Sequence, residues 1–351
     1  MDFTFSEEQL AFRDSIKRYL MNEFSPELIR ELWTTETGRF PGMWQTLAQQ
    51  GLTAISVPEA NGGLGLSEED WILLAEQCGY FGMFDSLLDT SMVAVGVLAG
   101  LEDAGVRDQW LERIAAGGAR VAVGHPLNPF VADAHVADLL LLSHNNEVHA
   151  VAPDEVRMER VESLDPSRRM FQLDWYPGAA VAGADEGQRL WAHALDQGAL
   201  ASSAQLLGLT QRMLDISIDY VAERKQFGKP VGSFQAVKHR LADVVIQLEF
   251  AKPVVHRAAN ALAQGSPLRS VYISQAKVAA ATVAAAAARN CIQVQGAMGY
   301  TWEMDLHIFM KRAWALDGLW GDRAHHKQRM DDYVLSEGAQ LGAGATFEAG
   351  N

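Results

Sequence analysis

The spacing of apolar residues changes twice along this chain of 351 residues, and the order of the changes constrains the fold most. Residues 188–351 carry regular helical stripes with apolar steps of three and four. One such stripe consists of Leu206, Leu209, Met213, Ile216 and Tyr220. Residues 118–187 hold short apolar runs separated by Pro, Gly, Asn and Asp, which is typical of strands. Residues 1–117 again favour helices, so the chain is predicted to be an α+β protein with three domains.

Several elements can be predicted within these three blocks. Ser6 followed by two glutamates predicts the start of a first helix, and the Pro-Gly break at 41–42 predicts a second helix at 43–50. The glycine-rich stretch 57–66 predicts a connection. Five runs predict strands: 121–123, 139–142, 148–152, 171–175 and 179–181. In the last block the helix expected at 271–296 contains an alanine-rich run, which favours close helix packing, and Pro253 is expected to bend the preceding helix.

Composition excludes several classes of function. The formal net charge of −15 disfavours nucleic acid and anionic membranes as partners, because both require a positive surface. No run reaches the roughly 18 unbroken apolar residues of a membrane helix, and the N-terminus lacks the pattern of a secretory signal. The only two cysteines, Cys78 and Cys291, are expected to be buried thiols, which favours a cytoplasmic location. We expect no metal site.

Basic residues concentrate within one stretch of seventeen residues, despite the acidic total. Its members are Arg224, Lys225, Lys229, Lys238, His239 and Arg240. A solvated cluster at a helix end is the simpler interpretation. A local site for a small polyanion is the alternative.

Three segments go beyond generic helix. They are residues 57–66, with Val-Pro-Glu and Gly-Gly-Leu-Gly-Leu, residues 223–240, with Arg-x-x-Phe-Gly and Phe-Gln, and residues 293–301, with Gln-Val-Gln-Gly-Ala-Met-Gly-Tyr-Thr. In order and spacing they resemble the acyl-CoA dehydrogenase family, over nearly the whole chain. The resemblance implies an N-terminal helical domain, a small middle β domain and a C-terminal four-helix bundle. It also implies FAD as cofactor and an acyl-CoA thioester as substrate.

The resemblance assigns cofactor contacts to the second and third segments, where family members hold the ADP half of FAD across a subunit interface. The positions that match are Arg224, Gln226, Phe227, Gln235, Gln293, Gly296 and Ala297. Their chemistry suits that role, because a guanidinium pairs with a pyrophosphate and a glycine lets backbone approach a ligand. Ala297 departs from the pattern, since the family usually has a second glycine there.

The family also needs a carboxylate that removes the α-proton of the thioester while the flavin accepts a hydride. The usual base is a glutamate before a glycine, and the matching position here is Trp320, before Gly321. Other members carry the glutamate on the helix that opens the last block, where this chain has residues 197–199 without an acid. The nearest carboxylates, Asp196, Asp317 and Asp322, are better explained as helix caps or surface acids. No catalytic residue is therefore predicted in this chain.

The strand domain departs from the family pattern as well. The usual Thr-Glu-Pro and Gly-Ser-Asp signature is replaced at residues 123–130, where His125 stands for the acid and Phe130 is bulky where little room is expected. The later Trp-Ile-Ser/Thr strand has no counterpart. His125 as a substitute base is an alternative, although a lone histidine is more often structural.

The departures from the family pattern are one-sided. Residues that would contact the flavin of a neighbouring subunit remain, whereas those that would bind the chain's own flavin and supply the base are missing. The pattern resembles the non-catalytic subunit of actinobacterial heterotetrameric (α2β2) dehydrogenases for steroid side-chain CoA esters. The prediction is a subunit that contributes FAD contacts while a homologous chain supplies the base, with an electron-transfer flavoprotein as a candidate electron acceptor. The alternatives are a self-sufficient homotetramer with a relocated acid and a flavin-free scaffold of the same fold.

Overall fold

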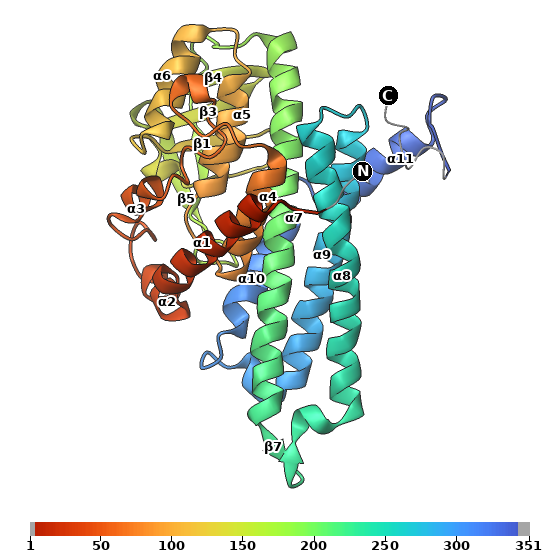
Figure 1. Cartoon of the computed structure of the whole chain (residues 1–351). Helices are drawn as coiled ribbons and strands as arrows, with labels where there is room; N and C mark the ends of the chain where they lie inside the picture. Colours follow the sequence, from red (N-terminus) through yellow and green to blue (C-terminus); the bar gives the residue numbers. More distant parts are fainter. Residues whose placement is uncertain (1–3, 343–351) are drawn as a thin grey trace.

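The computed structural model describes residues 4–342 and consists of helices at both ends of the chain with a small β region between them (Figure 1). The N-terminal helices are α1 (Glu7–Glu23), α2 (Pro26–Trp33), α3 (Met43–Gln49), α4 (Glu68–Tyr80), the π-helix η2 (Asp89–Ala94), α5 (Val95–Ala99) and α6 (Ala104–Ala115). The helix start predicted at Ser6 is confirmed, and it has a capping box in which the Gln9 backbone N–H donates to Ser6 Oγ at 3.1 Å. The α+β prediction is confirmed.

Two three-stranded sheets form the β region. One has the order β1-β3-β4, from β1 (Val121–Gly124), β3 (Leu139–His144) and β4 (Glu147–Val151), and the other has the order β2-β6-β5, from β2 (Val131–Ala132), β6 (Met170–Asp174) and β5 (Arg157–Val161). The pair β1–β3 is parallel, and the other pairs are antiparallel. The buried leucines of β3 explain why this run could be predicted, since both faces of the strand are covered.

The predicted strand at 179–181 is wrong. Only a single bridge forms there, between Ala182 and Val148, because the chain turns into helix α7 two residues later. The sequence prediction also missed α2, which begins with Ser25 as N-cap and Pro26 at the first helical position. Those two residues are a recognised start signal for a helix.

The C-terminal half is built from α7 (Ala184–Glu223), α8 (Gln235–Ala263), α9 (Arg269–Gln295), α10 (Leu306–Asp317) and α11 (Arg323–Val334). A short hairpin, β7 (Lys225–Gln226) and β8 (Lys229–Pro230), and the turn η5 (Val231–Ser233) join α7 to α8. The turn η6 (Gly296–Tyr300) follows α9. Figure 1 shows α7 running the length of the molecule, first beside the β region and then within the bundle, with the hairpin at its far tip.

Close packing around α7 depends on small residues. A Cβ on Gly208 would lie 1.9 Å from the carbonyl oxygen of Glu76, so α7 and α4 cross in direct backbone contact. Alanines of α9 are buried in the bundle centre. Helix α9 with η6 is the one segment among the described residues that is long and apolar enough to cross a membrane. Its most apolar part is 56% buried inside the protein, as expected for a core helix.

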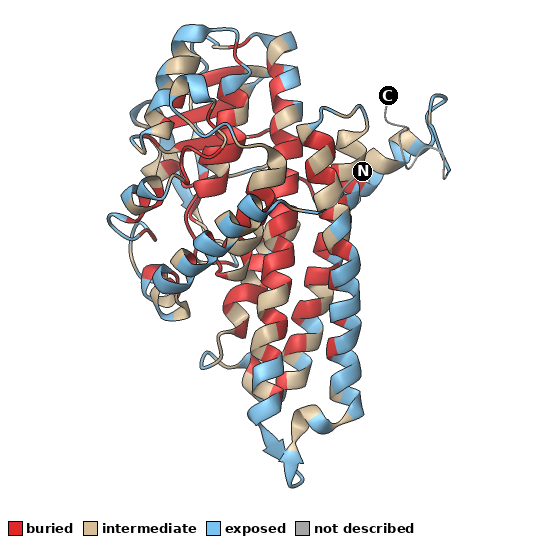
Figure 2. Cartoon of the chain, viewed as in Figure 1, coloured by how far each residue is buried: buried red, intermediate tan, exposed pale blue. Residues whose placement is uncertain are grey.

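Burial is uneven along the bundle (Figure 2). The middle of α7 is buried, whereas one side of α8 and the tip hairpin are exposed. Both cysteines are buried free thiols, as predicted, and burial raises the pKa of Cys291 to about 11.

Candidate functional site

The seven positions predicted to contact a cofactor lie at the tip of the bundle. Arg224 caps the end of α7, Gln226 and Phe227 form the hairpin, and Gln235 begins α8. Gln293, Gly296 and Ala297 lie at the end of α9 and in η6. A hydrogen bond from Gln295 Nε2 to Ser217 Oγ, at 3.1 Å, holds the end of α9 against the last turns of α7. All seven side chains or backbone positions are exposed.

This tip, defined by those seven residues, has polar groups without partners. Within residues 4–342 the guanidinium of Arg224 makes no hydrogen bond or ion pair. Gly296 has φ +63°, and a Cβ there would meet nothing within 4 Å, so its backbone is open to a ligand. Phe227 is 90% exposed with φ +53°, an uncommon conformation for a residue with a side chain. The Oε1 of buried Gln295 also lacks a donor. These features fit a surface that another molecule completes.

Trp320, at the position of the missing base, is packed into the interior. It is 3% exposed and has φ +58°. Its backbone N–H donates to Asn128 Oδ1 at 3.1 Å, and its carbonyl accepts from His326 Nε2 at 2.8 Å. Burial lowers the pKa of His326 to about 3, so the ring is neutral. The loop between α10 and α11 is thereby fastened to the segment that replaces the family's flavin-facing signature.

The two alternative base positions touch each other. Gly198 of α7 lies under the indole of Trp320, and a Cβ on Gly198 would come within 2.2 Å of the ring. A glutamate at either position would therefore reach the same space, which the indole now occupies. The cavity that remains beside them is about 50 Å³. A cavity of this size cannot hold a thioester beside the two base positions.

His125 belongs to this filled interior, and both of its ring nitrogens have partners. Its Nε2 donates to the carbonyl of Trp191 at 3.0 Å, and its Nδ1 accepts from the backbone of Leu127 at 3.1 Å. The ring also packs edge-on against Trp320, with 5.4 Å between centroids. Burial lowers its pKa to about 4. With both nitrogens engaged, the imidazole fills space and holds backbone.

The three aspartates considered as relocated bases each have a structural partner. Asp196 accepts from Ser270 Oγ at 2.5 Å and from Arg329 at 2.8 Å. Asp317 pairs with Arg323 at 3.0 Å, and Asp322 caps the start of α11. Helix capping and ion pairing account for all three.

Two buried ionisable groups next to Trp320 were missed. Asp89, in the π-helix η2, faces the residual cavity, and burial raises its pKa to about 6. Lys277 of α9 is fully buried and donates to Ser202 Oγ and to the carbonyls of Leu316 and Leu319. Burial lowers its pKa to about 7. A lone lysine inside an alanine-rich helix was the available signal, because a charge there needs buried partners.

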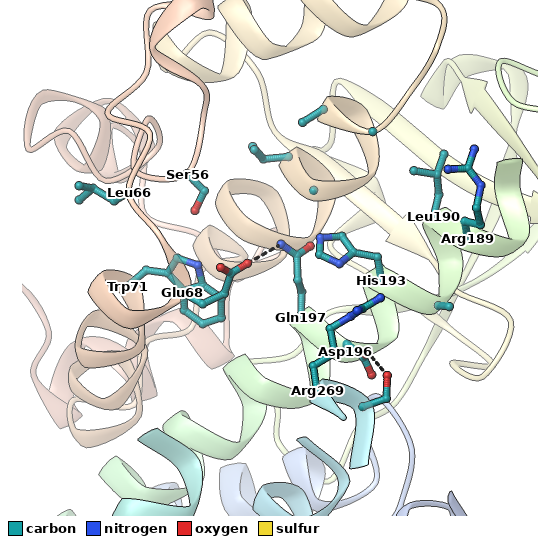
Figure 3. A pocket seen from close by; sticks show the side chains of 16 residues that line it. Ser56, Leu66, Glu68, Trp71, Arg189, Leu190, His193, Asp196, Gln197 and Arg269 are labelled. Atoms are coloured by element: carbon teal, nitrogen blue, oxygen red, sulfur yellow. Dashed lines mark hydrogen bonds between the residues drawn. The ribbon is translucent and has the colours of Figure 1, made fainter. Parts of the chain in front are cut away.

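A larger pocket lies elsewhere, between α4, α5, α7 and the start of α9 (Figure 3). It has a volume of about 690 Å³ and includes Glu68, His193, Gln197 and Arg269 among its lining residues. Burial lowers the pKa of His193. Sequence reasoning did not find this group, because its members come from three separate segments.

Comparison with known proteins now identifies the class. Residues 6–118 match the family model of the acyl-CoA dehydrogenase N-terminal domain, and residues 185–330 match that of the C-terminal domain. Acyl-CoA dehydrogenase FadE28 of Mycobacterium tuberculosis is 30% identical over 93% of this chain and 96% of its own length. The chain belongs to the acyl-CoA dehydrogenase family. Acyl-CoA dehydrogenase IpdE2 of Mycolicibacterium smegmatis is 29% identical, over 94% of this chain and 100% of its own length.

Solved structures share the fold at lower identity. A chain of the ChsE4-ChsE5 complex from Mycobacterium tuberculosis superposes with a TM-score of 0.86 at 22% identity, over 98% of this chain and 100% of that one. A variant of the Tcur3481-Tcur3483 steroid ACAD gives a TM-score of 0.82 at 24% identity, over 93% of this chain and 98% of that one. The FAD complex of PigA gives 0.84 at 18%, over 95% and 99%. These likenesses confirm the helical, β and helical arrangement predicted from the sequence.

Proposed function

We propose that this chain is a partner subunit of a heteromeric, FAD-dependent acyl-CoA dehydrogenase, and that a homologous chain supplies the base. One observation carries the proposal: the indole of Trp320 lies on Gly198 and fills both positions where a base is expected. The tip residues, in contrast, are exposed, and the guanidinium of Arg224 makes no hydrogen bond or ion pair within residues 4–342. A protein that keeps a cofactor-binding edge and fills its own reaction site needs another chain to do the chemistry.

FAD bound in the partner would supply the acceptor for a hydride from the substrate. Arg224 of this chain would then pair with the pyrophosphate, because its guanidinium is free to form two parallel hydrogen bonds. Gln226, Gln235 and Gln293 would donate to and accept from the ADP portion, and Phe227 would cover a flat ring. Gly296 and Ala297 would bring backbone close to the ligand.

The partner's docking face continues from this tip along α8. An apolar groove of about 500 Å³ runs between the end of α7 and α8, lined by Val221, Pro230, Val237, Leu241 and Val245 among others. Beyond it, Ile246 is 53% exposed and Phe250 75% exposed. Exposed apolar side chains in a continuous row are typical of an interface that another subunit covers. We propose that a homologous catalytic subunit covers these side chains in a heterotetramer. The proposed location of the complex is the cytoplasm.

The substrate class follows from relatives. A steroid dehydrogenase is among the proteins of the same fold, so a steroid side-chain CoA ester is the proposed acyl-CoA. An electron-transfer flavoprotein is the proposed electron acceptor.

The test is to purify the full chain alone and after co-expression with a homologous chain that retains the glutamate and the Gly-Ser-Asp signature. We expect the chain alone to lack FAD and activity, and the co-purified complex to contain both. A yellow, active assembly of this chain alone would instead show a self-sufficient enzyme. A complex without FAD would favour a scaffold.

A further inference from the structure

The pocket of about 690 Å³ is separate from the space around Trp320. The two cavities share no lining residue, and Gln197 of α7 faces the large pocket while the adjacent Gly198 faces the indole. Figure 3 shows the side chains of Glu68, Gln197, His193 and Arg269 gathering from three helices around the opening. The pocket therefore stays open although the base position is filled.

One wall of the pocket offers hydrogen-bond acceptors. Gln197 is 4% exposed, and its Nε2 makes only a long contact, 3.5 Å, with Glu68 Oε1. Its Oε1 has no donor among the described residues. Gly96 of α5 makes room for this oxygen, because a Cβ there would lie 2.0 Å away. Ser56, on the same side, has a buried hydroxyl that also lacks a partner. A buried unpartnered polar atom is costly, so this wall favours a ligand with hydroxyl donors.

The other wall is basic. Arg269 stands at the opening, with His193 between α7 and the pocket interior. Arg189 also lines the pocket, but it is ion-paired with Glu102 at 3.7 Å. Asp196 does not neutralise Arg269, because Arg329 and Ser270 already occupy its two oxygens. The guanidinium of Arg269 uses one nitrogen for the carbonyl of Ser266, at 3.2 Å, and keeps the others available. A guanidinium fork at a pocket mouth suits a phosphate or a carboxylate.

We propose that this pocket binds a hydroxylated organic anion, with its anionic group at Arg269 and its hydroxyl groups at Glu68 and Gln197. Leu66, Trp71 and Leu190 form the apolar sides that enclose the carbon skeleton. The ligand lies outside both base positions, so the site is a binding site and takes no part in hydride transfer. The inference does not depend on the proposed subunit role, because every contact comes from this chain.

Calorimetric titration of the full chain tests the proposal with four probes. Ribose 5-phosphate and gluconate represent the two sources of the anion, a phosphate ester and a carboxylate. Ribose and inorganic phosphate each carry only half of the required chemistry. We expect ribose 5-phosphate or gluconate to bind at least about tenfold more tightly than either half, since each added set of hydrogen bonds to a charged group contributes about 1.5–3 kcal/mol. Equal binding of ribose 5-phosphate and inorganic phosphate, or no binding of either hydroxylated anion, would overturn it.

Variants locate the site. Arg269→Gln is expected to weaken the anion about tenfold or more without unfolding the chain, because its side chain lies at the surface. Gln197→Leu should remove the preference for hydroxyl groups. Arg157→Gln is the matched control, since Arg157 is an exposed residue of β5 outside the pocket. Unchanged affinity in both pocket variants would refute the assignment, even if a probe binds.

Discussion

The tip of the bundle and the middle of α7 belong to one continuous helical system. Polar groups near the middle of α7 are buried and hydrogen-bonded, whereas those at the tip are exposed. Around Trp320, Asn128, His326 and Lys277 each form a hydrogen bond with a specific atom of the loop or its neighbours. At the tip, Arg224 and Gly296 are left open. In the region of Trp320, buried hydrogen bonds hold the loop in place. At the tip, the exposed groups have room to bind a second molecule.

The largest effect is expected where the interior is closed. Trp320→Ala should lower the free energy of unfolding by about 3–5 kcal/mol, because a large buried side chain leaves a cavity that the surroundings only partly fill. Urea denaturation measures the change. Trp314→Ala is the control, since Trp314 is 42% exposed, and we expect a loss below about 1 kcal/mol there. Equal losses for the two variants would mean that Trp320 does not plug the site.

Charge reversal at the tip is the second test. Arg224→Glu should weaken FAD retention by the co-purified complex about 100-fold, because a charge-assisted bond of about 1.5–3 kcal/mol is lost and repulsion is added. Bound FAD per complex, measured by absorbance after gel filtration, reports the change. Arg157→Glu, on β5, should retain the cofactor. Full FAD occupancy in the Arg224→Glu variant would show that Arg224 does not contribute to cofactor binding.

Adding a methyl group at Gly198 tests whether this position is in contact with the indole of Trp320. Gly198→Ala should destabilise the chain by about 1–3 kcal/mol through overpacking against the indole, although alanine is otherwise favoured in a helix. In the Trp320→Ala background the cost should largely disappear, because the obstructing ring is gone. Gly178→Ala, with nothing within 4 Å of the added Cβ, is the control. Additive costs in the double variant would show that the two positions do not meet.

The last effect is a change of stability with pH. Lys277 has its pKa lowered from 10.5 to about 7 in the folded chain, so above pH 7 the unfolded state binds the extra proton. Stability from this group therefore rises between pH 7 and about 10.5, and the penalty is complete below pH 7. Comparing wild type with Lys277→Met across this range, by thermal unfolding, should show wild type gaining relative to the variant. Parallel curves would place the folded pKa of Lys277 near its usual value.

Periodicity alone predicted the long helices of the C-terminal half and the core strands, because α7, α9 and β3 bury nearly continuous apolar faces. It did not predict β5, whose residues are half exposed, or the hairpin at the tip, which has only two residues in each strand. The run at 179–181 reads like a strand but precedes a helix too closely to pair. Short elements lack the repeated side chains on which such predictions depend.

Only part of the candidate site could be predicted from the sequence. Motif order led to Arg224, Phe227, Gln293 and their neighbours, and to the absence of a glutamate at Trp320. The roles of Asp89 and Lys277, and the group around Gln197, could not be predicted because each is defined by partners far away in the chain. Burial and pairing, not residue type, decide the charge state of such groups.

The sequence by itself determined the α+β class and the family, since these depend on local period and on motifs at matched positions. Only the tertiary structure decided that Trp320 and Gly198 meet, that the vacated space is filled, and that a second pocket stays open. The physical reason is that close packing is a property of segments brought together from distant positions. A missing side chain becomes a filled site only when another side chain occupies its volume.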